Sequence, residues 1–324
     1  MQLSFAPLEG ITGWVFRSIH HQMFPGLSAY YAPFSAPTMD SPLTGRGLAD
    51  VLPEHNEGVP LIPQLLTNQA EAFLAAADRL EALGYREVNL NLGCPSGTVV
   101  AKRKGAGFLS LPDQLDAFFD TVFSRTRLRV SVKTRLGLEV PDQWPRLLEI
   151  FNRYPIALLI VHPRVRTDYY RGPVRMEAFR YAAEHTVLPL CYNGDLNTVR
   201  NCLDLTAQFP RLQGLMAGRG MVANPALGRE LAGGPPLTRT ELMTFHDRLL
   251  AAYSDLYSGD RPVLGKMKEL WFYQSCLFAQ TEKPMKRLRK ARTLEAYRDA
   301  AAALFRDCDF LPDGAFSPDR AVQM

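Results

Sequence analysis

The sequence predicts an α/β protein in which a (β/α)8 TIM barrel is followed by a smaller, all-helical domain. Up to about residue 232, short apolar segments alternate with longer amphipathic stretches, the repeating pattern that such a barrel requires. The breaker cluster Gly233-Gly234-Pro235-Pro236 follows, and no strand pattern appears after it. We therefore expect a barrel domain over residues 1–234 and a helical domain with a C-terminal tail over residues 235–324.

Eight apolar segments have the length and composition of strands. They are Leu3–Ala6, Ala29–Ala32, Leu61–Leu65, Glu87–Leu92, Leu128–Lys133, Ala157–Val161, Leu188–Tyr192 and Gly214–Ala217. Between them, stretches such as 68–83, 112–125 and 198–209 carry apolar residues at helical spacing. Beyond residue 236, the same spacing predicts helices over 240–257, 263–280 and 294–306.

Composition is that of a globular protein. With 324 residues, 47% of them hydrophobic and 22% charged, the chain can bury a full-sized core. Its five cysteines form no CxxC or Cys/His cluster, which argues against a disulfide framework or a structural zinc site. No apolar run approaches about 18 residues, and the first basic residue is Arg17, so we expect no membrane span, no signal peptide and a cytoplasmic location.

Positive charge is concentrated in the helical domain. Residues 261–298 contain ten lysines and arginines against three glutamates, a local charge of +7, although the whole chain carries only +4. This asymmetry suggests a polyanionic partner, and the alternative is a solvated helical face. The consecutive aromatic residues 271–273 could stack on bases, but we expect Trp271 to belong to the core.

Residues 89–109 carry the strongest signal of reactive chemistry. The strand alternates apolar and polar residues, and Gly93-Cys94-Pro95 then places a thiol in a loop at its carboxyl end, where barrels bind ligands. Three cations, Lys102, Arg103 and Lys104, and a Gly-Ala-Gly turn follow. Cys94 is therefore a candidate acid or nucleophile, and the alternative is a small buried hydrophobic residue.

Polar residues and glycines occupy seven of the eight predicted strand ends. In chain order these ends read Ala6-Pro7-Leu8-Glu9-Gly10, Pro63-Gln64, Asn91 with Cys94, Lys133-Thr134-Arg135, His162-Pro163-Arg164, Asn193-Gly194-Asp195 and Gly218-Arg219-Gly220. Glycines after the last two strands are typical of a phosphate site built from backbone N–H groups. A phosphate-bearing cofactor would place its phosphate at Gly218 and Arg219, and its reactive ring would face Lys133, Gln64 and Cys94.

In this order, the motifs from Ala6 to Arg219 resemble the tRNA-dihydrouridine synthases, which are FMN-dependent barrels with a C-terminal helical RNA-binding domain. The Asn91-x-Gly-Cys-Pro segment, with its downstream lysine and Gly-Ala-Gly, is the most specific part. The sequence departs from the family pattern at Leu8, where Met is usual, and at Gly13, where Asp is usual. It also has His162-Pro163-Arg164-Val165 where His-Gly-Arg-Thr is usual.

The resemblance implies that NADPH reduces FMN, that the flavin N5 passes a hydride to C6 of a tRNA uridine, and that Cys94 protonates C5. An ordinary thiol, with a pKa of about 8.5, is mostly protonated at neutral pH and can act as this acid. It also implies that Lys133 stabilises the reduced flavin, that Gln64 hydrogen-bonds the ring and that His162 lines it. The other implied FMN contacts are Pro7, Leu8 and Glu9 on the ring, and Asn193, Gly194, Asp195, Gly218 and Arg219 on the phosphate.

To reach the barrel mouth, the target base must swing out of folded RNA. Asn91, which has both a donor and an acceptor, suits the uracil edge. Two groups of cations are expected to contact RNA phosphates: Lys102, Arg103, Lys104, Arg135, Arg164 and Arg166 at the mouth, and Lys286, Arg287, Arg289 and Lys290 in the helical domain. Recognition of one tRNA by shape is compatible with a monomer, which we expect.

Three alternatives share some of these features. An FMN-dependent dihydropyrimidine or dihydroorotate oxidoreductase has the same barrel, but a free base does not need a cationic domain. A Schiff-base aldolase would use Lys133 without a flavin, and a yellow protein would exclude it. A non-catalytic RNA-binding barrel is disfavoured by the intact cysteine and lysine.

Overall fold

The computed structural model describes residues 2–321, which fold into two compact units. The barrel unit comprises the chain up to Pro7, Ser28–Gly194 and Thr206–Met216. The helical unit comprises Leu8–Leu27, Asp195–Leu205 and the chain from Ala217 onward. The helical unit therefore includes stretches from before residue 234 as well as residues 235–321, and the domain boundary predicted at residue 234 stays a prediction.

Nine parallel strands form a nearly closed barrel, which confirms the predicted fold class. They are β1 (Gln2–Phe5), β2 (Ala29–Tyr31), β3 (Leu61–Ile62), β4 (Gln64–Leu65), β5 (Glu87–Leu92), β6 (Arg129–Thr134), β7 (Leu159–Val161), β8 (Leu190–Asn193) and β9 (Gly214–Ala217). Their order in the sheet is β3-β2-β1-β9-β8-β7-β6-β5-β4. Each predicted strand begins and ends within two residues of an observed one.

The predicted strand 61–65 is divided into β3 and β4 by Pro63, which has no N–H to donate to a sheet. The Pro63 carbonyl still accepts a hydrogen bond from the Asn89 N–H at 2.8 Å. Because β3 lies at one end of the strand order and β4 at the other, this short segment brings the two ends of the sheet together.

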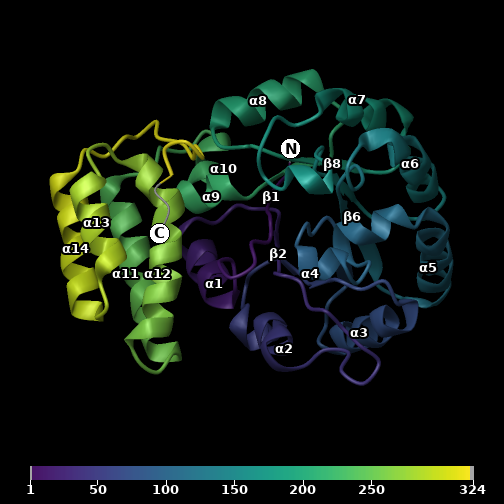
Figure 1. Ribbon diagram of the computed structural model, residues 1–324, viewed down its shortest axis with the longest axis horizontal. Helices are drawn as coiled ribbons and strands as arrows, with labels where there is room; N and C mark the ends of the chain where they lie inside the picture. The colour runs from purple at the N-terminus through teal and green to yellow at the C-terminus, as the bar shows by residue number, and fades with distance from the viewer. Residues whose placement is uncertain (1, 322–324) are drawn as a thin grey trace. The chain divides into compact units, whose positions relative to one another are not determined.

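Helices follow the strands around the outside of the barrel unit. They are α2 (Gly45–Val51), α3 (Ala70–Ala82), α4 (Gly97–Val100), α5 (Pro112–Arg125), α6 (Trp144–Asn152) and α7 (Met176–His185). The residues of α8 (Val199–Gln208) are divided between the two units, with those up to Leu205 assigned to the helical unit and those from Thr206 to the barrel unit. Helices α3, α5, α6 and α7 lie next to one another in chain order, from blue to teal in Figure 1. Short 3-10 turns cover Pro53–His55, Gly105–Ser110, Pro141–Gln143 and Arg166–Asp168. The α5 sequence explains its helix, because Pro112 occupies the first turn and Leu115, Phe118 and Val122 form one buried stripe.

The two faces of the strands differ in chemistry. Side chains alternate between faces along a strand, so Val88 and Leu90 share one buried face of β5 and Asn89 shares the other with Asn91. Asn89 bonds to Ser131 of β6, which in turn bonds to Tyr31 of β2. Since β2 and β6 are not neighbours in the sheet, these side chains meet inside the barrel. Part of the barrel interior is therefore polar.

The helical unit contains α1 (Trp14–Met23), α9 (Arg219–Ala223), α10 (Leu227–Leu231), α11 (Arg239–Leu256), α12 (Asp260–Gln274), α13 (Glu282–Lys290) and α14 (Leu294–Asp307). Helix α12 contacts α11 and α14, and α13 packs on α14 (Figure 1). Trp271 is fully buried, and its Nε1–H donates to the Tyr297 hydroxyl at 2.8 Å. The prediction that Trp271 belongs to the core is confirmed.

The helix predicted over 263–280 is shorter than expected. Helix α12 ends at Gln274, a 3-10 turn covers Ser275–Leu277, and Gln280 has a positive φ of 60°. Tertiary contacts explain the break, because Phe278 is buried against Trp271 and pairs with Phe310 in a β-bridge. Within residues 2–321, no helix has both the length and the apolar character needed to cross a bilayer.

Candidate active site

The loop after β5 is held by the side chain of Asn91. Its Oδ1 accepts hydrogen bonds of 2.9 Å from the backbone N–H groups of both Gly93 and Cys94. Asn91 is only 8% exposed, whereas Cys94 is partly exposed. A buried carboxamide therefore fixes the backbone that carries the predicted catalytic thiol.

A chain of hydrogen-bonded side chains extends from Asn91 into the barrel. Asn91 Nδ2 donates to Gln64 Oε1 at 2.7 Å, and Gln64 Nε2 donates to Asn89 Oδ1 at 2.7 Å. Asn89 Nδ2 then donates to Ser131 Oγ at 3.0 Å. Carboxamide nitrogen and oxygen atoms are ordinarily hard to tell apart. Here the N–H groups of Gly93 and Cys94 both need an acceptor, so the atom of Asn91 that faces them must be its oxygen. This orientation in turn fixes the orientations of the Gln64 and Asn89 amides.

Lys133 lies beside this chain on β6. It is paired in register with Asn91, so the two side chains point to the same face of the sheet. The pKa of Lys133 is lowered to about 7, mainly by burial and in part by the charge of Arg135, while Cys191 and Cys94 act in the opposite direction. Burial also raises the pKa of Cys191 to about 12. The site thus holds an amine that an added negative charge would help to protonate.

The Gly-Ala-Gly turn forms the wall behind Cys94. Gly105 has a φ of +56°, and a Cβ there would lie 3.0 Å from both the Cβ and the carbonyl oxygen of Cys94. The Ala106 N–H donates to the same carbonyl at 3.1 Å. Glycine is therefore required at residue 105, both for its backbone conformation and for the close approach of Cys94.

The three cations before this turn lie near the surface. Lys102 and Arg103 are exposed, and Lys104 is partly buried, which together with the charge of Lys102 lowers the Lys104 pKa. Asn68 Nδ2 donates to the carbonyls of Lys102 and Arg103 at 3.3 and 3.2 Å. The accessible charges are compatible with the predicted phosphate contacts, which stay predictions.

Two of the arginines predicted to contact phosphates are buried instead. Arg135 is 1% exposed, and its guanidinium donates to the carbonyls of Gly93 and Val165 at 2.9 Å each and of Tyr169 at 2.6 Å. Arg164 is 2% exposed and donates to the Gly172 carbonyl at 2.6 Å. An RNA phosphate would have to displace these internal bonds. The positions of both arginines therefore argue against phosphate contact and for a structural role in holding loops.

Arg166, by contrast, is partly exposed. Its Nε donates to the Pro95 carbonyl at 3.2 Å, so it lies beside the loop that carries Cys94. Of the three arginines predicted after β6 and β7, Arg166 is the one that solvent reaches most easily.

His162, at the end of β7, is 6% exposed and accepts at Nε2 from Arg164 Nη1 at 3.0 Å. An arginine can only donate, so Nε2 carries no proton and the imidazole is the neutral Nδ1–H form. Its ring stacks against Tyr170 with centroids 6.2 Å apart. His162 is thus oriented in the barrel, as a ligand-lining residue would need to be.

The remaining predicted residues of the barrel unit are Pro7, Asn193 and Gly194. Asn193, at the end of β8, donates through Nδ2 to the Met216 carbonyl at 2.7 Å. A Cβ on Gly194 would approach the Tyr192 hydroxyl and a Val174 methyl to 3.1 Å. Pro7 is partly exposed. Nothing in these contacts tests a role in binding a phosphate or a flavin.

The predicted residues of the helical unit form three groups. Arg219 Nη2 donates to Asp195 Oδ1 at 2.6 Å, and Gly218 precedes the first residue of α9. The Leu8 N–H donates to Thr12 Oγ1 at 2.8 Å, and Glu9 is exposed. Four cations of α13 are exposed, whereas Met285 and Leu288 of the same helix are buried; these cations are Lys286, Arg287, Arg289 and Lys290.

Two residues of the site were not predicted, Asn89 and Ser131. Each stands two residues before a predicted site residue, Asn91 on β5 and Lys133 on β6, and so shares its face of the strand. The period-two rule could have identified them, because polar residues inside an apolar strand need a buried partner.

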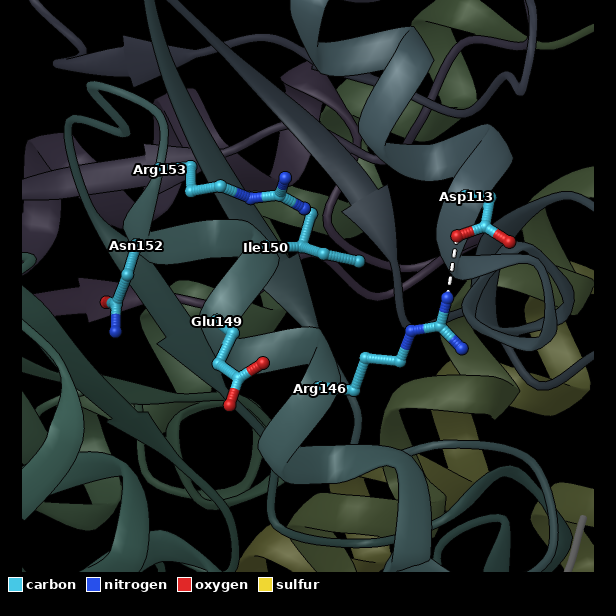
Figure 2. Close-up of a pocket in the computed structure, with 6 residues that line it drawn as sticks. All are labelled: Asp113, Arg146, Glu149, Ile150, Asn152 and Arg153. Carbon is cyan, nitrogen blue, oxygen red and sulfur yellow. Dashed lines mark hydrogen bonds and ion pairs between the residues drawn. The ribbon is translucent and has the colours of Figure 1, made fainter.

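A surface pocket of about 500 Å³ lies elsewhere, between α5 and α6 on the outside of the barrel unit. It is lined by Asp113, Arg146, Glu149, Ile150, Asn152 and Arg153. Figure 2 shows Arg146 turned toward Asp113, with which it forms an ion pair of 2.6 Å. The pocket contains no predicted site residue, and we assign it no role in the reaction.

Comparisons with known proteins identify relatives of this chain. A 28% identical relative, named "tRNA-dihydrouridine(16) synthase" from Pseudomonas putida, aligns over 77% of this chain and 79% of its own length. A "Probable tRNA-dihydrouridine synthase 1" from Synechocystis is also 28% identical, over 70% of this chain and 63% of its own length, so the match spans less than two thirds of that relative.

The structure of an old yellow enzyme homologue from Zymomonas mobilis shares the barrel fold, with a TM-score of 0.51 at 13% identity over 73% of this chain and 90% of that one. The family model described as "Dihydrouridine synthase (Dus)" matches residues 4–295. Because this match covers almost the whole chain, the protein belongs to the dihydrouridine synthase family.

Proposed function

We propose that this protein reduces a uridine of tRNA to 5,6-dihydrouridine, with FMN as its cofactor and NADPH as the reductant. The observation that carries the proposal is the Cys94 loop. Its backbone is bound by the side chain of Asn91, which is paired in register with Lys133 on the neighbouring strand. A thiol, an amine and oriented amide donors are the groups that reduction of a pyrimidine ring calls for.

The donor set suits a flavin ring. Gln64 and Asn91 each use one side-chain N–H inside the amide chain, and a carboxamide has two, so each retains a donor for a ligand. Lys133, with its pKa lowered to about 7, would gain most from a ring that becomes negatively charged. Bound FMN would supply hydride transfer to the uracil ring, with electrons taken from NADPH. Gln64, Lys133 and His162 would hold the flavin.

Cys94 would donate its Sγ proton to C5 of the uracil. Its backbone is fixed at two points, by Asn91 Oδ1 at the N–H and by the Ala106 N–H at the carbonyl. Fixing the backbone limits the positions that the thiol can take, which favours proton transfer from one direction.

Asn91 would recognise the base through its remaining N–H. Because Oδ1 already accepts two backbone hydrogen bonds, Asn91 can offer only a donor, which suits a carbonyl oxygen of uracil. The base would be extruded from the RNA to reach this position. Lys102, Arg103, Lys104 and Arg166 would contact phosphates around it.

Among the remaining predicted residues, the role of Asp195 changes and the others keep their proposed roles. Arg219 and the backbone at Gly218 would bind an anionic phosphate, and Asp195 would orient Arg219 rather than contact the phosphate, since a carboxylate repels it. Pro7, Leu8 and Glu9, and Asn193 and Gly194, stay proposed contacts of FMN. The exposed α13 cations would bind tRNA, with residues 235–324 as the RNA-binding domain of a monomer.

The test begins with the purified protein, which should absorb as a flavoprotein. With NADPH and a pool of unmodified tRNA transcripts it should form dihydrouridine, measured by mass spectrometry of nucleosides. Free uracil and dihydroorotate serve as competing substrates. A colourless protein that still modifies tRNA would contradict the flavin assignment, and turnover of the free base alone would favour the small-molecule oxidoreductase.

A further inference from the structure

The loop after β7 is fixed by hydrogen bonds from two buried arginines and by an ion pair. Both buried arginines are bonded to it, Arg135 to the carbonyls of Val165 and Tyr169, and Arg164 to the carbonyl of Gly172. The Asp168 carboxylate accepts from the Val165 N–H at 2.9 Å and forms an ion pair with Arg175. Two guanidinium groups are thus removed from water to fix the position of this loop.

Tyr169, near the tip of the loop, has a strained backbone. Its φ is 49° and its ψ is −105°, a combination that glycine adopts easily and a bulky side chain does not. Glycine would be the unstrained choice at this residue. Strain of this kind persists where the surrounding structure enforces it, and it is concentrated at functional sites.

The loop presents two tyrosine rings to solvent. Tyr169 is 44% exposed and Tyr170 is 52% exposed, although large hydrophobic side chains on the same unit are mostly buried. The Arg166 guanidinium lies 5.1 Å from the centre of the Tyr169 ring, and the Arg135 guanidinium lies 5.3 Å from that of Tyr170. Both rings therefore contact cations while remaining accessible to solvent.

This pair of rings lies next to the Cys94 loop. Arg166, which contacts the Tyr169 ring, also donates to the Pro95 carbonyl at 3.2 Å. Tyr170 stacks on His162 at the end of β7. Further exposed cations are Arg171 on the same loop and, on the loop after β5, Lys102 and Arg103.

We propose that Tyr169 and Tyr170 form a stacking platform for unpaired bases of the RNA substrate, beside the uridine that reaches Cys94. This inference rests on the proposed function, because it takes RNA as the substrate. Aromatic rings accept any base through its π-face, and neighbouring cations neutralise the phosphates between stacked bases. The platform would hold the nucleotides next to the extruded uridine.

The decisive variant is Tyr169→Gly, assayed in the full-length protein with its flavin. This variant removes the ring and also relieves the strained backbone, so the melting temperature should stay unchanged or rise. If Tyr169 had only a structural role, its replacement by glycine would cause no loss of tRNA affinity. We expect binding of unmodified tRNA transcripts to weaken by about 5- to 150-fold, the range for one base stacked on an aromatic ring. Flavin content should not change. The matched control Tyr169→Phe keeps the ring and should bind as the wild type does.

Salt dependence separates stacking from a charge effect. Loss of a stacked base lowers affinity equally at all salt concentrations, whereas loss of a phosphate contact flattens the dependence of log K on log salt. Wild-type affinity in Tyr169→Gly, or a flattened slope, would overturn the platform. Tyr170→Leu provides a second variant, for which we expect a loss of tRNA affinity with an unchanged slope.

Binding is measured without NADPH, so the two proposals fail in different ways. If the wild type binds tRNA through Tyr169 yet forms no dihydrouridine when NADPH is added, the proposed reaction is wrong and the platform stands. If the wild type forms dihydrouridine and Tyr169→Gly binds and reacts normally, the platform is wrong and the reaction stands.

Discussion

The side-chain oxygen of Asn91 accepts a hydrogen bond of 2.9 Å from the backbone N–H of Cys94. The same oxygen binds the Gly93 N–H, so the reactive loop is tied to the last polar residue of the strand that precedes it. Because Asn91 is itself held by Gln64, and Gln64 by Asn89, the position of the thiol depends on side chains deep in the barrel.

Replacement of Cys94 by alanine should separate the two halves of the proposed reaction. Reduction of the flavin by NADPH needs no thiol, whereas protonation of uracil C5 does. We expect normal flavin reduction, followed by absorbance under anaerobic conditions, and a loss of dihydrouridine formation of about 10² to 10⁴, the usual contribution of a general acid. Full turnover of tRNA by Cys94→Ala would assign the acid to another group.

Asn89→Leu should loosen the Cys94 loop from inside the barrel. The substitution leaves an N–H of Gln64 without its acceptor, which costs about 1–3 kcal/mol for a buried polar group, and it removes one bond of the Ser131 hydroxyl, which keeps its bond to Tyr31. The rate of Cys94 alkylation by iodoacetamide, measured by peptide mass spectrometry, should change, and dihydrouridine formation should fall.

The conservative variant Asn89→Asp provides the matched control. A carboxylate still accepts from Gln64, and the Ser131 hydroxyl can turn to donate to it, so the amide orientations at Gln64 and Asn91 are kept. We expect this variant to restore most of the wild-type alkylation rate and activity. Equal alkylation rates in Asn89→Leu and wild type would show that the chain does not position the thiol.

Lys133 should make stability depend on pH. Its pKa is lowered from 10.5 to about 7 in the folded state, mainly by burial. Between these pH values the unfolded chain binds a proton that the folded chain lacks, so the free energy of unfolding rises with pH across this window and is flat below it. Urea denaturation of flavin-free protein from pH 6.5 to 9.5 would measure the rise. Lys133→Met should lose it, and identical pH profiles for the two proteins would contradict the shifted pKa.

The exposed face of α13 should contribute to tRNA binding. Replacing Lys286, Arg287, Arg289 and Lys290 together by glutamine keeps the buried Met285 and Leu288 that attach the helix. We expect weaker tRNA binding and a flatter salt dependence, since each lost phosphate contact removes slightly under one unit of slope. Flavin content should not change.

A charge-matched control neutralises four exposed arginines at or before the amino ends of β5 and β6, away from the strand ends that bear the site: Arg86, Arg125, Arg127 and Arg129. This variant loses the same net charge and should keep the wild-type slope. If both variants reduce the slope equally, overall charge rather than a surface on α13 governs binding.

Local sequence was sufficient to predict the elements of the barrel and the candidate site. A strand is recognised from the residues within it, and period-two alternation with turn residues at each end located all eight predicted strands to within two residues. Cys94 and Lys133 could be identified because barrels place functional groups directly after their strands, which is also a local relationship.

Tertiary structure decided which polar groups are available to a ligand. Arg135 looked like an accessible cation, but its partners Gly93 and Tyr169 lie 42 and 34 residues away in the chain, and only the fold brings them to the guanidinium. Helix α12 stops at Gln274 because Phe278 is buried against distant aromatic residues. Propensity and periodicity depend on neighbours in sequence, whereas burial and hydrogen-bond partners depend on neighbours in space, so the second could not be obtained from the first.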